Sequence, residues 1–198
     1  MLRSLRPFLL LVALVLVPWA SARAQLTIEI VGGAGTAIPI AVFPLGISGV
    51  VAADLARSGV FKMIDPAGVS PAPFRAEEVR SDAWRARGAD AVVVGSMRTL
   101  ADGRVDVRFA LVDVVKNTPL VGMTYVVTPA QFRATAHKIA DVIYEKLTGD
   151  PGVFSTRIAY ITKSGPRFQL LVAGADGSDP QTIVTSNEPL LSPRWSPD

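Results

Sequence analysis

Two periodicities alternate between residues 38 and 149, and this alternation limits the possible folds more than any other feature of the sequence. Short apolar segments typical of strands are predicted at 38–45, 61–64, 91–94, 105–115 and 120–128. Helical spacing of apolar residues separates them at 49–57, 76–87 and 129–147. Interleaved strands and helices favour an α/β domain with a mixed sheet and two to three helices over residues 38–149.

Turn and cap residues mark the ends of these segments. Ser48 is a predicted N-cap of the first helix, and Gly59 is its predicted stop. Asp102-Gly103 predicts a tight hairpin, so the strands around it and the strand that follows should form an antiparallel section of one sheet. Pro129 suits the first position of the long helix, and Gly149 suits its end.

Two helices carry predicted buried faces. In the second helix, Val79, Ala83 and Trp84 should point inward. In the long helix, one stripe is expected to face the core, formed by Phe132, Ala136, Ile139, Ala140, Ile143 and Leu147.

The pattern changes after Asp150, because no helical periodicity follows. Short strands are predicted at 157–162, 168–173 and 181–185, separated by turn residues. Closely spaced short strands are typical of one blade of a β-propeller or of a β-sandwich, and 49 residues of this kind are too few to bury a core alone. We expect residues 150–198 to be the start of an all-β propeller, in a chain that is a fragment.

The first 24 residues have the layout of a cleavable signal peptide. Arg3 and Arg6 precede the apolar run 8–17, and small residues at positions 22 and 24 predict cleavage after Ala24. An uncleaved anchor is the alternative, but this run is short for a hydrocarbon core of about 30 Å. We therefore expect export with removal of this segment.

Charge and cysteine content narrow the function classes. Removing the three arginines of the signal leaves 17 basic and 17 acidic residues, so the exported chain is formally neutral and gives little support to a nucleic-acid or membrane-surface partner. The absence of cysteine excludes a disulfide framework, so stability must come from the core.

Patterns that could carry chemistry are incomplete. Gly32, Gly33 and Gly35 follow a strand-like segment, but no helix start follows them, so a hinge is favoured over nucleotide binding. His137 is the only histidine, and Asp141 lies one helical turn later, which would suit an oriented base. Without a second histidine, a cysteine or a serine elbow, a structural pair is favoured.

Two further groups have simpler interpretations. Glu77, Glu78 and Asp82 lie among arginines, so an ion-paired, solvated face is predicted rather than a pair of catalytic carboxylates. Trp195 could be a ligand platform, but packing between repeats is favoured. We predict no enzymatic activity, no catalytic residue, no metal and no cofactor.

Several segments together resemble the TolB family of the Tol-Pal cell-envelope system. They are Leu26–Ile30, Gly49–Leu55, Asp90–Gly95, Leu111–Asp113, Glu145–Gly149, Thr156–Tyr160 and Ser192–Asp198. They occur in the family's order and span nearly all of the chain after the signal. The link after Phe43 is shorter than the family pattern, and the propeller is absent beyond its first blade.

The resemblance implies an α/β domain before a six-bladed propeller, in a non-catalytic periplasmic adaptor. It implies binding of inner-membrane TolA by the exported N-terminus and of the outer-membrane lipoprotein Pal by the propeller. The implied roles are outer-membrane integrity, constriction during cell division and a route for bacteriocin import. A monomer is expected.

The expected TolA-binding site lies in a flexible segment, residues 25–37. Its residues are Gln25, Leu26, Thr27, Ile28, Glu29, Ile30 and Val31. Alternation of apolar and polar residues suits a strand that adds to the edge of a partner's sheet, although the same strand could pair within its own domain.

Two other function classes stay open at this point. A periplasmic hydrolase with its catalytic domain beyond residue 198 would need a serine elbow there. A binding module for a small metabolite would need more chain to form two lobes around a cleft.

Overall fold

The computed structural model describes residues 37–196, so the predicted signal peptide, the glycine cluster and the predicted partner-binding segment lie outside the described residues. Within this range a five-stranded sheet has the order β2-β1-β3-β4-β5. Its strands are β1 (Ile38–Val42), β2 (Phe61–Ile64), β3 (Ala91–Thr99), β4 (Val105–Asp113) and β5 (Thr118–Val127). β1 is parallel to both β2 and β3, whereas β3, β4 and β5 are antiparallel. The predicted mixed sheet is therefore confirmed.

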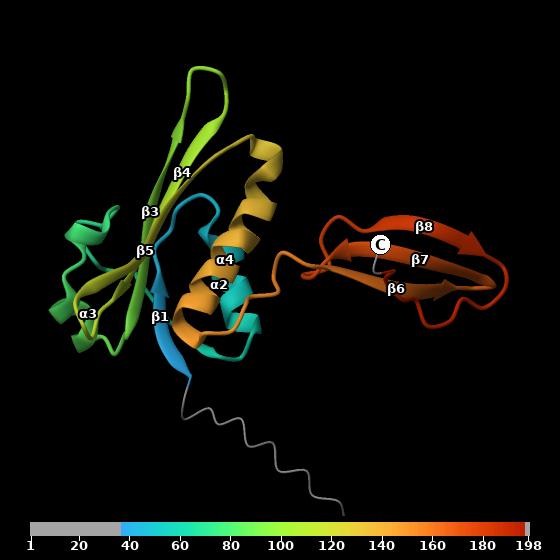
Figure 1. The fold of residues 1–198 in the computed structure, drawn as a ribbon, viewed down its shortest axis with the longest axis horizontal. Coiled ribbons are helices and arrows are strands. Elements are labelled where there is room, and N and C mark those ends of the chain that lie inside the picture. Colours follow the sequence, from blue (N-terminus) through green and yellow to red (C-terminus); the bar gives the residue numbers. More distant parts are fainter. Residues whose placement is uncertain (1–36, 197–198) are drawn as a thin grey trace, which may run out of the picture. The chain divides into compact units, whose positions relative to one another are not determined.

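Helices cover both faces of this sheet. They are α2 (Ser48–Arg57), the short 3-10 helix η1 (Ala76–Glu78), α3 (Ser81–Ala86), the 3-10 helix η2 (Pro129–Gln131) and α4 (Phe132–Thr148). Figure 1 shows α2 and α4 on one face and α3 on the other. The β3–β4 hairpin extends past α2 and α3 in the same view.

Each face has its own buried cluster because side chains alternate along the strands. Under α2 and α4 the cluster includes Val93, Phe109 and the predicted stripe of α4, in which Ala136, Ile139, Ala140 and Ile143 are buried. On the other face Trp84 of α3 packs edge-on against Phe43 with ring centroids 5.3 Å apart. Val92 and Val94 of β3 belong to this second cluster, so the central strand is buried on both faces, as predicted.

The second helix differs from its prediction. A single helix over 76–87 was expected, but Val79 and Arg80 adopt extended backbone angles between η1 and α3. Burial of Val79 in the second cluster accompanies this break, and α3 begins only at Ser81. The restarted helix buries Trp84 but exposes Ala83, so the predicted inward position of Ala83 is wrong.

The start of α2 also departs from expectation. Ser48 is the first helical residue rather than the N-cap, and its hydroxyl accepts a hydrogen bond from the Leu45 backbone N–H, with N···O 3.1 Å. The hydroxyl therefore closes the loop that enters the helix. The predicted stops hold, because Gly59 and Gly149 have positive φ angles of 72° and 86°.

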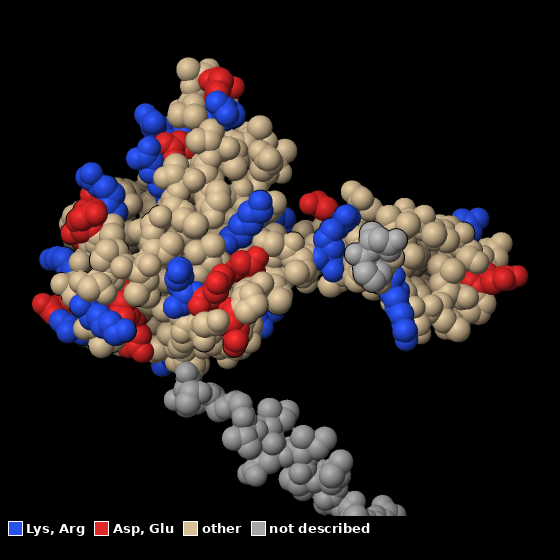
Figure 2. All heavy atoms as spheres, viewed as in Figure 1, with Lys and Arg blue, Asp and Glu red and all other residues tan. Residues whose placement is uncertain are grey.

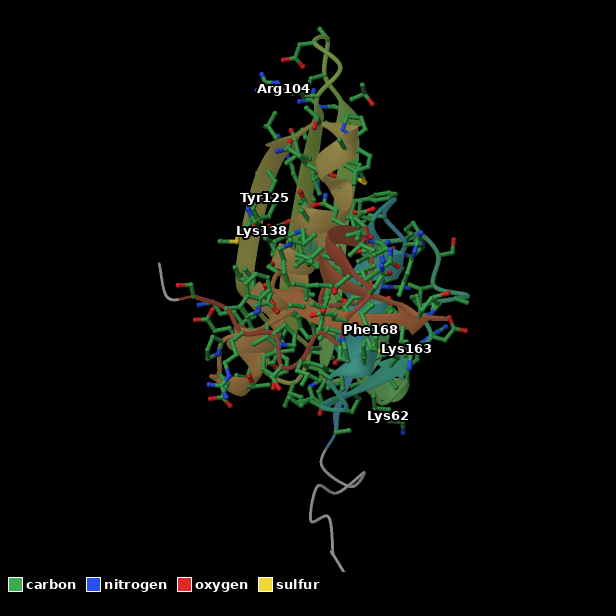
Figure 3. All side chains as sticks on the ribbon, turned by 90° about the vertical axis from the view of Figure 1, so that its right-hand side faces the viewer. Lys62, Arg104, Tyr125, Lys138, Lys163 and Phe168 are labelled. Carbon is green, nitrogen blue, oxygen red and sulfur yellow. The ribbon has the colours of Figure 1, made fainter. Side chains whose placement is uncertain are left out.

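Strand limits change by a few residues. β1 ends at Val42 rather than Leu45, and β3 continues to Thr99 as one arm of the hairpin. Gly103 in the predicted hairpin turn and Asn117 in the turn between β4 and β5 both have positive φ. Arg104 lies at the tip of the hairpin (Figure 3).

A second sheet follows α4 and contains three antiparallel strands in the order β6-β7-β8. They are β6 (Arg157–Ser164), β7 (Arg167–Gly174) and β8 (Gln181–Ser186), close to the predicted ranges. Val172 and Ala173 are its only buried apolar residues among those described, so most of its side chains are at least partly exposed. Between residues 37 and 196, no helix combines the length and apolar character that a membrane span requires.

Candidate functional site around His137

The described residues bring a chain of charged and polar groups together around the only histidine. His137 lies on α4, and its Nδ1 is 2.5 Å from Oδ2 of Asp54 on α2. Both side chains are buried, with exposed fractions of 8% and 1%. Because an ionised carboxylate can only accept a hydrogen bond, Nδ1 carries the proton that faces Asp54. Asp54 also accepts a hydrogen bond of 2.7 Å from Arg57 Nη2.

The other nitrogen of His137 faces a second carboxylate. Nε2 lies 3.4 Å from Oδ2 of Asp176, in the turn between β7 and β8, without forming a hydrogen bond. Arg133, one turn before His137 on α4, donates hydrogen bonds to the same oxygen of Asp176. One imidazole thus lies between two carboxylates, and each carboxylate also contacts an arginine.

The predicted partner of His137 is wrong. Asp141 accepts hydrogen bonds from the backbone N–H groups of Phe154 and Ser155, with N···O distances of 2.7 and 3.1 Å. Gly152 packs closely against Asp141, because a Cβ at residue 152 would lie 2.4 Å from the Asp141 Cα. This packing brings the segment between α4 and β6 onto α4. Asp141 therefore positions the chain that enters β6 and does not orient the imidazole.

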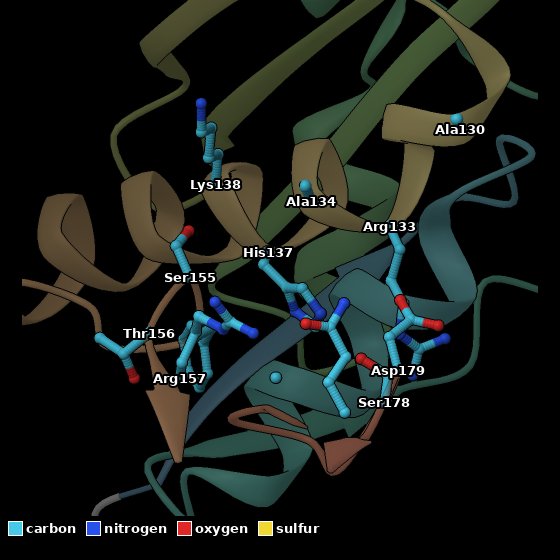
Figure 4. Close-up of a pocket in the computed structure, with 13 residues that line it drawn as sticks. Ala130, Arg133, Ala134, His137, Lys138, Ser155, Thr156, Arg157, Ser178 and Asp179 are labelled. Atoms are coloured by element: carbon cyan, nitrogen blue, oxygen red, sulfur yellow. The ribbon is translucent and has the colours of Figure 1, made fainter. Parts of the chain in front are cut away.

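A cavity of about 270 Å³ opens beside His137. Its wall is formed by α4 and by the segments around β6 and the β7–β8 turn, including Arg133, Lys138, Ser155, Arg157, Ser178 and Asp179. Figure 4 shows Arg133 and His137 projecting from α4 toward Ser178 and Asp179. The lining of the cavity combines charged and hydroxyl side chains with apolar Phe154, so the cavity can accept a polar group.

Asp176 should make the stability of this chain sensitive to acid. Burial alone raises the pKa of this carboxyl, but hydrogen bonds from the Ser178 side chain and backbone and from Arg133 outweigh it and hold the pKa well below its usual 3.8. A lowered folded-state pKa adds stability above pH ~4 that is lost as the pH falls through the folded-state value.

We expect Asp176→Asn to lower the unfolding free energy by about 2 kcal/mol near neutral pH. The difference from the unmodified chain should shrink as the pH falls below ~4, because protonation of this carboxyl in the unfolded state then removes the stability that its low folded-state pKa adds. Urea unfolding of both chains across this pH range measures this difference in unfolding free energy. A difference that stays constant down to the lowest pH would contradict the assignment.

Other predicted groups have simple environments. Glu78 contacts Arg75 and Asp82 contacts Arg85, so these two acids of the predicted face are ion-paired. Trp195 is exposed, and its packing between repeats stays a prediction. No group of three or more potential metal ligands occurs within residues 37–196.

Known protein families match both parts of this architecture. Residues 26–120 match the model of the TolB amino-terminal domain, and residues 144–198 match the model of the TolB beta propeller domain. The chain belongs to the TolB family. The α/β domain with its three helices is therefore the TolB amino-terminal fold, and β6–β8 begin a TolB propeller, as the resemblance implied.

Individual TolB relatives extend this match. A Tol-Pal system protein TolB from Aromatoleum aromaticum is 52% identical over 198 residues, which cover 96% of this chain and 46% of the relative. Another from Thiobacillus denitrificans is 50% identical over 207 residues, covering 100% and 48%. The crystal structure of TolB from Acinetobacter baumannii superposes with a TM-score of 0.72 at 35% identity, covering 80% of this chain and 41% of that chain. The chain spans about half the length of the curated relatives it matches, and membership of the family places it in the Tol-Pal system.

Proposed function

We propose that the chain is part of a non-catalytic periplasmic adaptor that links inner-membrane TolA to the outer-membrane lipoprotein Pal. The observation that carries this proposal is the presence of both TolB domains, in order, on one chain whose relatives are named as Tol-Pal system proteins. The roles proposed for it are outer-membrane integrity, constriction during division and bacteriocin import. A monomer without a cofactor suits such a role.

In this proposal, each function is assigned to one segment of the chain. Residues 1–24 direct export and are removed after Ala24, and residues 25–37 form the TolA-binding segment. Residues 38–149 form the α/β domain, and residues 150–198 begin the propeller, through which the longer protein would bind Pal. Within the TolA-binding segment, Leu26, Ile28 and Ile30 would supply side-chain specificity while the backbone pairs with an edge of the TolA sheet.

The environment of His137 supports a non-catalytic role. A general base must reach a substrate proton, but Nδ1 of His137 is hydrogen-bonded to Asp54 and Nε2 is buried beside Asp176. Arg133 and Asp141 connect α4 to the turns and linker of the second sheet. These contacts suit a group that holds two parts of an adaptor together.

Calorimetry tests the TolA contact directly. Residues 25–198 should bind the periplasmic C-terminal domain of TolA, and a version without residues 25–31 should lose this binding. Substitution of Thr27 and Glu29 by alanine is the matched control, because it keeps the three apolar side chains and the backbone. Equal binding by the deleted and undeleted chains would move the site into the folded domain, and no binding by either would contradict the TolA contact.

A further inference from the structure

Half of one sheet face is left without a covering helix in the described part of the chain. Near the start of β3 this face is covered by α3, Val79 and Trp84. Farther along the hairpin the same face carries Ser96 and Arg98 on β3, then Asp106 and Arg108 on β4, as the strand register requires. The facing residues of β5 are Thr124 and Val126, both exposed. This uncovered region, the outer half-face, is separate from the cavity beside His137.

The outer half-face contains a buried carboxylate held by two exposed arginines. Asp106 is only 7% exposed, although no helix of the described range lies over it, because Arg98 and Arg108 fold across it. Arg108 contacts Asp106 through Nε at 3.1 Å and Nη2 at 2.8 Å, and Arg98 through Nη2 at 3.5 Å. Hydrogen bonds from Arg108 outweigh burial and lower the pKa of Asp106, so the carboxylate stays ionised at neutral pH.

This arrangement leaves positive charge and hydrogen-bond donors for a ligand. Two guanidinium groups share one carboxylate, so the cluster carries a net charge of about +1. The arginine side chains are 73% and 60% exposed, and each guanidinium has five N–H donors, of which Asp106 uses a minority. Ser96, Arg98, Asp106 and Arg108 line a recess of about 390 Å³. Figure 2 shows basic side chains beside acidic ones along the hairpin.

A second, more apolar recess adjoins the first. It measures about 320 Å³ and shares Arg108 with its neighbour. Exposed Phe74 lies at its rim, and Gly122 and Thr124 of β5 form part of its floor. Gly122 leaves the floor open, because a Cβ there would approach only the Phe109 carbonyl oxygen, at 3.8 Å. Arg75 and Glu77 also line this second recess. The outer half-face is thus a groove with a cationic end and a mixed end that offers apolar surface beside Phe74.

We infer that this groove binds an extended acidic segment of a protein partner, with a carboxylate at Arg98 and Arg108 and an apolar side chain beside Phe74. Charge complementarity selects an anion, since fixed guanidinium groups recognise carboxylates through paired hydrogen bonds. A nucleic acid would need a longer basic stripe than a single net charge provides. The apolar recess favours a peptide over a free inorganic anion. This surface lies on the folded domain and is additional to the proposed TolA contact of residues 25–31.

The test uses the full chain and a blocked peptide in which Glu and Leu alternate, with a Gln-and-Leu peptide as the uncharged probe. Backbone NMR shifts should change on β4 and β5 only with the Glu peptide, and binding should weaken at high ionic strength. Arg98→Gln with Arg108→Gln should reduce affinity by about tenfold or more. Arg85→Gln is the matched control, because Arg85 also pairs with one carboxylate but lies on α3.

Gly122→Leu provides a variant that keeps every charge. It should fill the apolar recess and reduce peptide affinity by about fivefold or more while leaving the fold intact. Deletion of residues 25–31 should not change peptide affinity, which separates this inference from the TolA proposal. Equal binding of the Glu and Gln peptides would overturn the inference. So would inorganic phosphate, or phosphatidylglycerol vesicles, binding at the two arginines while the Glu peptide does not.

Discussion

Gly95→Ala is expected to destabilise the α/β domain by at least about 3 kcal/mol or to prevent its folding. Gly95 lies in β3, where an added Cβ would come within 2.2 Å of the Arg108 carbonyl oxygen and 3.2 Å of the Phe109 Cα. Both contacts are with backbone of the paired strand β4, so no side-chain rotation can relieve them. Leu45 closes the remaining space, with its Cδ2 3.1 Å from the same Cβ. Urea unfolding followed by circular dichroism measures the loss.

Gly122→Ala is the matched control for this prediction. It makes the same chemical change in the same sheet, on β5, but the new methyl group would lie in ordinary contact distance of its only neighbour. Alanine has fewer backbone conformations than glycine in the unfolded chain, so Gly122→Ala should be neutral or should stabilise the domain by up to about 1 kcal/mol. If both variants unfolded at the same urea concentration, close packing at Gly95 would not determine the stability of the sheet.

Asp54→Asn is expected to cost about 3 kcal/mol of unfolding free energy, because it removes the charge from the centre of a buried polar chain. The amide would leave His137 Nδ1 without its carboxylate at a position that water hardly reaches. Arg57 would lose its partner too, although its exposed side chain can be solvated. The helices α2 and α4 meet at this pair, so the loss should appear as lower stability of the whole domain.

An exposed carboxylate supplies the comparison for Asp54. Asp82→Asn also removes one aspartate that pairs with an arginine three residues away, but Asp82 is 92% exposed. Its expected cost is below about 1 kcal/mol. Equal losses of unfolding free energy at the two positions in urea unfolding would show that burial of the polar groups around His137 adds nothing to stability.

Local patterns were sufficient for most of the fold because the strands and helices obey their own periodicities. Phe61–Ile64 and the α4 stripe were predicted from spacing alone, and the positive φ angles of Gly59 and Gly149 match residues chosen as helix stops. The break at Val79 was missed because it depends on burial against the sheet, which helical spacing does not reveal.

The site was less predictable, because it combines residues far apart in sequence. Local spacing suggested Asp141 as the partner of His137, whereas Asp54 lies 83 positions away. One signal was available: Asp54 falls between Val51 and Leu55 on the buried face of α2, where an acid needs a partner. Asp176 gave no such signal, since Asp176-Gly177 reads as an ordinary turn.

The position of β1 in the sheet has a consequence for the order of folding. β1 pairs with β2 and β3, yet its partner residues in β3 follow about 50 positions later in the chain, while β3, β4 and β5 are joined by tight turns. Loop closure therefore favours early formation of the β3–β5 meander and late insertion of β1 beside it. Complete covering of the apolar face of that meander also requires α4, the last helix of the domain, so the face around Val93 and Phe109 stays partly exposed until nearly 150 residues of the chain are present.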